Sequence, residues 1–151
     1  MVVVSVWTKW MVFLSIVIMI AGLCFAIVFP YFIPQAIEPF FTELTGGTFG
    51  DLTPAEVGFH NLLSAVIGGT LFGWGLMIAL LSFRLTKVSD NWIWSVIAIS
   101  VFAWYILDTL GSALVGSTLN ILLNTTILIL ALPPLIVNRE AVVKGFGDLR
   151  S

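Results

Sequence analysis

The sequence predicts an all-α integral membrane protein, a bundle of four transmembrane helices. Of its 151 residues, 60% are hydrophobic and 9% are charged, and the mean hydropathy is +1.13. A soluble domain carries roughly 25% charged residues, so this chain has too few to cover a surface that faces water. The few charges also leave four long uncharged stretches, one for each predicted helix.

The positions of the charged residues set the bounds of the predicted spans. No charged residue lies between Lys9 and Glu38 or between Glu56 and Arg84, and two further uncharged stretches flank Asp108. A helix needs about 20 apolar residues to cross the hydrocarbon of a bilayer. Within a single membrane domain, residues 1–151, we place the spans at 10–31, 56–82, 91–110 and 114–133, an outer loop at 32–55 and a cytoplasmic tail at 134–151.

The lysines and arginines predict how the chain is oriented. All six fall on the side of the four-span arrangement that holds both termini; they are Lys9, Arg84, Lys87, Arg139, Lys144 and Arg150. By the positive-inside rule the termini are cytoplasmic, and loop 32–55 lies on the outer side of the cytoplasmic (plasma) membrane. The net charge of −2, with no basic patch, excludes a nucleic-acid partner.

Local signals predict where several helices begin and end. Apolar residues in "IPQAIEPFFTELTGG" recur at helical spacing, so we expect a short interfacial helix that begins at Pro34 and ends at Gly46-Gly47. The segment Thr53-Pro54-Ala55-Glu56 has the S/T-x-x-E pattern of a capping box, which gives Glu56 a structural role. Pro133-Pro134 is expected to break the fourth helix, because proline has no backbone N–H.

Polar side chains are predicted to gather in the outer half of the bundle. The topology places polar residues of the second, third and fourth spans at similar depth, and their i, i+4 spacing aligns them on one face of each helix. Because an unpaired polar group in hydrocarbon costs several kcal/mol, these faces should turn inward. The predicted polar core consists of Glu56, His60, Asn61, Ser64, Asp108, Ser112, Asn120 and Asn124. Trp74 and Trp104 are expected to pack nearby in the core.

This polar core has three interpretations. It is a hydrogen-bond network that fixes the register of the helices, a pocket for a small ligand, lipid or quinone head group, or a metal site formed by Glu56, His60 and Asp108. A transition-metal site normally uses more nitrogen or sulfur ligands than one histidine supplies. The single cysteine excludes an internal disulfide, and the sequence identifies no cofactor.

A glycine-rich stretch in the second span, "GGTLFGWG", is predicted to be a packing face. Its glycines are Gly68, Gly69, Gly73 and Gly75. Small residues four apart, such as Gly69 and Gly73, let two helices approach closely, whether the second helix belongs to the same bundle or to a neighbouring subunit.

We therefore expect a small non-catalytic membrane protein that contacts membrane lipids. It would serve as an accessory or assembly subunit of a larger membrane complex, or associate with itself. The alternative is a bundle that binds a small ligand, a lipid or a quinone, or a membrane enzyme, with His60 and Asp108 at its centre.

Overall fold

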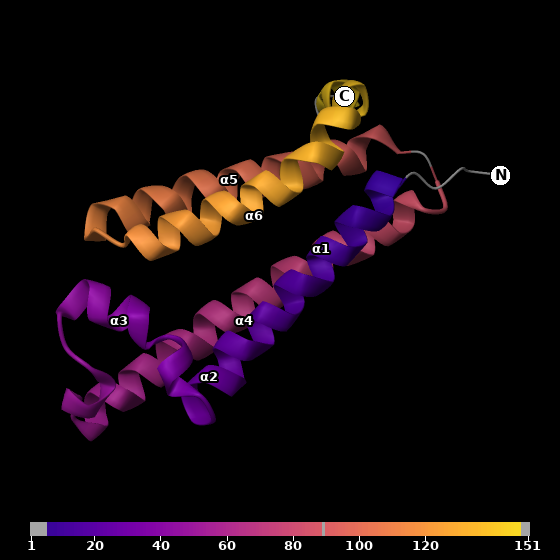
Figure 1. Ribbon diagram of the computed structural model, residues 1–151. Helices are drawn as coiled ribbons and strands as arrows, with labels where there is room; N and C mark the ends of the chain where they lie inside the picture. Colours follow the sequence, from indigo (N-terminus) through magenta and orange to yellow (C-terminus); the bar gives the residue numbers. More distant parts are fainter. Residues whose placement is uncertain (1–5, 89, 149–151) are drawn as a thin grey trace.

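The computed structural model describes residues 6–88 and 90–148, and all of their regular secondary structure is helical (Figure 1). The helices are α1 (Val6–Leu23), α2 (Phe29–Tyr31), α3 (Glu38–Thr45), α4 (Pro54–Leu85), α5 (Asn91–Val115), α6 (Thr118–Val137) and α7 (Arg139–Asp148). A π-helical turn joins α1 to α2, so that Val6–Tyr31 is one continuous span. This span, α4, α5 and α6 are long and apolar enough to cross a membrane.

Several predicted helix ends differ from those in the structure. The third span was predicted to end at residue 110, but α5 continues to Val115 and ends at Gly116, whose φ of 79° is left-handed. The short helix predicted to begin at Pro34 consists of two pieces, a 3-10 turn at Pro34–Ala36 and the α-helix α3, which begins at Glu38. Pro39 lies in its first turn, where proline is tolerated, and Gly46, with φ 73°, ends it as predicted.

The predicted break at Pro133 and Pro134 is wrong, because α6 continues through both prolines to Val137. Pro134 has no N–H to donate to the carbonyl of Leu130, one turn earlier in the helix. The indole Nε1 of Trp10, on α1, donates to this carbonyl instead, at 2.8 Å. A neighbouring helix therefore supplies the hydrogen bond that proline removes, which allows the helix to continue in an apolar environment.

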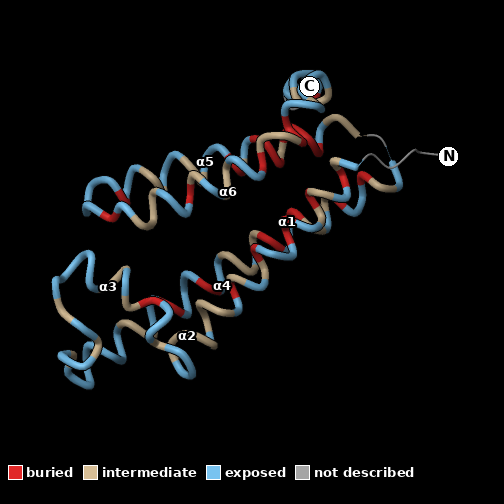
Figure 2. The backbone as a smooth tube through the Cα atoms, viewed as in Figure 1, coloured by how far each residue is buried: buried red, intermediate tan, exposed pale blue. Residues whose placement is uncertain are grey.

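The four spans form two antiparallel pairs that meet at one end (Figure 1). The Val6–Tyr31 span packs along α4, and α5 packs along α6. The buried side chains concentrate at the end of the bundle that carries α7, where they come from all four spans (Figure 2). They include Met11, Ile78, Ile97 and Leu135. At the opposite end, which carries α3, the pairs diverge.

Glycines hold α1 and α4 together. A Cβ atom built on Gly22, Gly68 or Gly75 would lie 3.0 Å or less from backbone atoms of the facing helix. Gly22 and Gly68 therefore leave no room for a Cβ atom without movement of the backbone, and Gly75 is packed almost as tightly. A Cβ atom on Gly69 or Gly73 would meet nothing within 4 Å, so those two glycines lie outside the contact between α1 and α4.

The first span widens into its π-helical turn beside this contact. The turn covers Cys24–Val28 and ends just before Pro30, which lies in α2. In a regular α-helix the ring of Pro30 would meet the carbonyl of Ala26, four residues earlier, and a π-helical turn is one way to relieve that clash. The turn also brings Phe25 to the space between the two helix pairs.

Substituting Gly68 with alanine should destabilise the protein, while the same change at Gly69 should not. The new methyl group at Gly68 would meet the backbone of Gly22 and Ala26. Overpacking of this kind typically costs about 1–3 kcal/mol. Thermal unfolding followed by circular dichroism in mild detergent measures the difference, with Gly69→Ala as the matched control. Equal melting temperatures for the two variants would contradict the assigned contact between α1 and α4.

Candidate functional site

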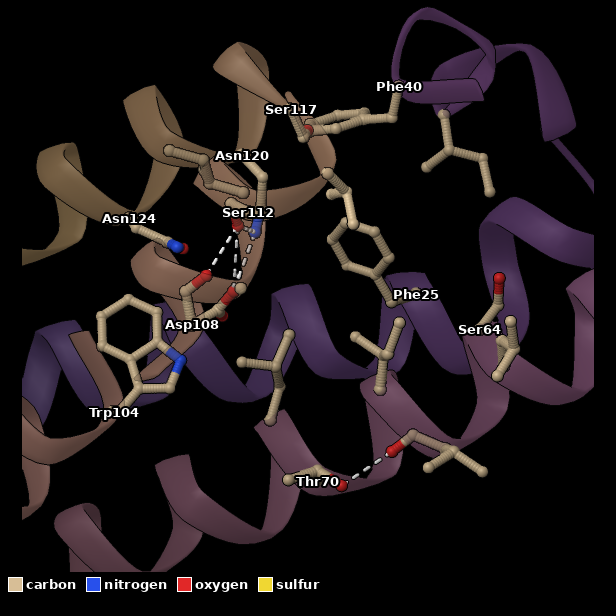
Figure 3. Close-up of a pocket in the computed structure, with 18 of the residues that line it drawn as sticks. Phe25, Phe40, Ser64, Thr70, Trp104, Asp108, Ser112, Ser117, Asn120 and Asn124 are labelled. Atoms are coloured by element: carbon tan, nitrogen blue, oxygen red, sulfur yellow. Dashed lines mark hydrogen bonds between the residues drawn. The ribbon is translucent and has the colours of Figure 1, made fainter. Parts of the chain in front are cut away.

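A cavity of about 880 Å³ lies between the two helix pairs, in the half of the bundle that carries α3 (Figure 3). Most of its lining is apolar and comes from all four spans and from α3. Representative residues are Phe25, Phe40, Leu63, Trp104 and Leu123. Sites for small molecules commonly enclose about 300–1,000 Å³. We refer to this cavity as the cleft.

A cluster of three polar side chains, Asp108, Ser112 and Asn120, lies on the α5–α6 wall of the cleft (Figure 3). The Asn120 Nδ2 donates to Asp108 Oδ1 at 2.9 Å and to Ser112 Oγ at 2.7 Å. The Ser112 hydroxyl in turn donates to the backbone carbonyl of Asp108 at 2.7 Å. Asp108 and Ser112 are one turn apart on α5, and Asn120 follows on α6 across the short turn at Gly116. This connection brings the three residues together.

The α4 wall of the cleft carries His60 and Ser64, one helical turn apart. The His60 ring is half-buried and meets the Phe49 ring edge-on, with 4.9 Å between the ring centroids. Its Nδ1 lies 3.5 Å from the side-chain oxygen of Asn61. No described hydrogen bond joins His60 to the Asp108 cluster on the facing wall.

Two residues of the predicted polar core lie outside the lining of the cleft. Glu56 is exposed, and its Oε2 accepts the Thr53 N–H at 2.8 Å and the Thr53 hydroxyl at 2.7 Å. This arrangement confirms the capping box expected at the start of α4. Asn61 lies next to His60 but does not face the cleft.

Two tryptophans line the cleft near its innermost end, where the pairs converge. Trp74 and Trp104 are half-buried, and their ring centroids lie 4.9 Å apart. The Trp74 Nε1 donates to the hydroxyl of Ser100 at 2.6 Å. Because both indoles face the cleft, their fluorescence would report on its contents.

Helix α3 lies beside the wide end of the cleft and joins α6 through a contact that the sequence did not indicate. The Glu43 carboxylate accepts the backbone N–H groups of Thr118, at 2.9 Å, and Leu119, at 3.2 Å. The Ser117 hydroxyl donates to it as well, at 3.1 Å. Ser117 stands at the N-cap of α6 but makes no capping hydrogen bond of its own, so Glu43 caps α6 in its place.

The structure thus brings six of the eight predicted polar residues to the cleft. They are His60, Ser64, Asp108, Ser112, Asn120 and Asn124. Among the described residues, no group of three or more His, Cys, Asp or Glu side chains is placed to hold a metal ion, so Glu56, His60 and Asp108 do not form one. Glu43 was missed because the residues that it contacts lie more than 70 positions further along the chain.

Comparison with known proteins adds no assignment. No family model matches the chain, and neither a curated protein nor a solved structure matches it significantly.

Replacing Glu43 with glutamine should loosen the start of α6. Loss of a hydrogen bond worth about 1 kcal/mol corresponds to roughly fivefold faster local opening. Hydrogen–deuterium exchange of the peptide containing Thr118 and Leu119 measures this rate. Glu38→Gln is the matched control, because Glu38 also lies in α3 but accepts the N–H of Phe49 within the loop. Glutamine keeps one acceptor oxygen, so unchanged exchange in Glu43→Gln would show that the charge and the second oxygen of the carboxylate do not stabilise the start of α6.

Proposed function

We propose that the protein binds an amphiphilic molecule from the membrane in the cleft between its two helix pairs. The observation that supports this proposal is a cavity of about 880 Å³ whose walls are apolar except for compact polar groups. An apolar chain would fill most of the cleft, and a polar head group would reach the Asp108 cluster.

The distribution of charge supports an orientation for the cleft. The described lysines and arginines all lie at the α7 end of the bundle, whereas the α3 end carries Glu38, Glu43, Asp51 and Glu56. Under the positive-inside rule the α7 end and both termini are cytoplasmic. On this reading, which is part of the proposal, the cleft lies in the outer half of the plasma membrane, and α3 lies at the outer interface.

Filling the cleft should abolish binding without unfolding the protein. Gly111 lines the cleft on α5, and a Cβ atom there would meet nothing within 4 Å. A leucine at this position would therefore extend into the space that the ligand needs. The probe is a monoacylglycerol with a brominated chain, added at low mole fraction to phosphatidylcholine nanodiscs that contain the protein. Bromine quenches indoles that it touches, so we expect saturable quenching of Trp74 and Trp104 that Gly111→Leu removes.

Gly58→Leu is the control for this experiment. Gly58 also lies in a spanning helix with nothing within 4 Å of its Cβ position, but it does not line the cleft. The Gly58→Leu variant should show the same saturable quenching as the unmodified protein. Quenching that never saturates, or that survives Gly111→Leu, would overturn the proposed binding site.

A second candidate function is that of a subunit in a larger membrane assembly, through the face of α4 that turns away from α1. Gly69 and Gly73 lie one turn apart on this face, both are exposed, and neither has a neighbour within 4 Å of its Cβ position. Small residues at this spacing allow the close approach of another transmembrane helix. Neither glycine is among the residues that line the cleft, although Val66 and Thr70, about one turn away, are.

Gly69→Leu should disrupt such an assembly while leaving the cleft intact. Native mass spectrometry of the protein, extracted from its own membrane in mild detergent, reports the chains that accompany it. We expect additional chains, or a second copy, at fixed stoichiometry in the native protein and their loss in Gly69→Leu, with Gly111→Leu as the control. A lone chain in every sample would contradict the subunit function.

A further inference from the structure

The hydrogen-bond donors of the Asp108 cluster are already used within the cluster. Asn120 has two N–H groups on Nδ2, and these point to Asp108 Oδ1 and Ser112 Oγ. The single hydroxyl proton of Ser112 is best placed on the Asp108 backbone carbonyl, at 2.7 Å, because its distance to Asp108 Oδ1 is 3.4 Å. No strong donor of these three side chains therefore remains for a ligand.

The same cluster retains free acceptors. Asp108 Oδ2 and the Asn120 side-chain oxygen have no hydrogen-bond partner among the described residues. Both side chains are half-buried and line the cleft, so a head group in the cleft could reach these oxygens. A donor on that head group would pair with an acceptor that has no partner in the protein.

The remaining polar groups of the cleft are mixed. The Trp104 indole and the His60 ring present nitrogens that can donate, on the α5 and α4 walls. The Ser64 and Ser100 hydroxyls can either donate or accept, so they discriminate little between ligands. Asn124 is 2% exposed, and its amide is directed to Thr109 at 3.5 Å. No lysine or arginine is among the residues that line the cleft.

The charge at the α3 end of the bundle also disfavours an anionic head group. Between Lys9 and Arg84 the chain contains no lysine or arginine, and the α3 end of the bundle carries four carboxylates. An anionic head group would be repelled by this field and would find no cation at the Asp108 cluster. A neutral or cationic head group meets neither obstacle.

We propose that the cleft selects amphiphiles whose head group donates hydrogen bonds, a hydroxyl or an amine, over amphiphiles with an anionic head group. Asp108 is the specificity-determining residue, because its free carboxylate oxygen accepts from the head group while its other oxygen is held by Asn120. This inference rests on the proposed function and adds the chemical class of the ligand.

The test is a competition among single-chain amphiphiles that share one lauryl chain and differ in the head group. Monolaurin, dodecylamine, laurate and dodecyl phosphate each displace the brominated monoacylglycerol from the protein in phosphatidylcholine nanodiscs, and recovery of indole fluorescence measures displacement. We expect monolaurin and dodecylamine to compete about tenfold or more better than the two anions, the factor that one hydrogen bond to a charged group provides.

Asp108→Asn tests the assigned residue. The new amide can still accept from Asn120 through its oxygen, while its NH₂ group replaces the free acceptor with a donor. We expect dodecylamine to lose about tenfold in competition and the anions to gain. Asp90→Asn is the matched control, because Asp90 caps α5 at the other end of the bundle. The ranking of the four probes on the unmodified protein tests the inference even if Asp108→Asn does not fold.

The outcomes separate this inference from the proposed function. Saturable quenching with equal competition by laurate and monolaurin would overturn the head-group preference and leave the binding site standing. Absence of saturable quenching would overturn both. Displacement by glycerol or ethanolamine, which lack a chain, would support the head-group preference but show that the ligand is water-soluble rather than drawn from the membrane.

Discussion

The close approach of two backbones, at Gly22 and Gly68, is the constraint on which the rest of the structure depends. Apolar side chains gain little from meeting one another in lipid, so helices associate through tight packing and hydrogen bonds. The first span and α4 achieve that packing along much of their length, because Gly75 extends the contact toward the α7 end. They form one fixed wall. The second pair joins this wall mainly at the α7 end, and the cleft is the space left between them.

The hydrogen bonding of the polar groups differs between the two ends of the bundle. At the α7 end, the carbonyl of Leu130 that Pro134 leaves free is satisfied by Trp10, and Ser95 donates to the carbonyl of Val142 in α7 at 2.5 Å. At the α3 end, Asp108 and Asn120 each keep an unused acceptor that faces the cleft. Unsatisfied polar groups are not confined to the α3 end, because the buried Ser82 hydroxyl, near the end of α4, also has no partner among the described residues. Asp108 and Asn120 differ from Ser82 in that they line the cleft, where a ligand could reach their free oxygens.

The sequence was most informative where the signals were local. Composition predicted the four apolar helices, and the Thr53–Glu56 motif predicted the start of α4. The predicted depth in the membrane and the i, i+4 spacing also placed Asp108, Ser112 and Asn120 near one another, because a short turn joins their helices. The choice between Gly68 and Gly69 as the contact glycine was not predictable, since it depends on the rotation of α4 about its axis. That rotation is set by packing against α1, which no local pattern records.

The Glu43 cap has a consequence for how the protein assembles. The carboxylate belongs to the connection between the first two spans, whereas the amides that it accepts begin the last span. A chain synthesised from its N-terminus completes the first pair well before α6 exists. The cap can form only once the final helix is in place, so closure over the cleft is a late event in biogenesis. Until that moment the apolar wall formed by the first pair faces the surrounding lipid rather than α5 and α6.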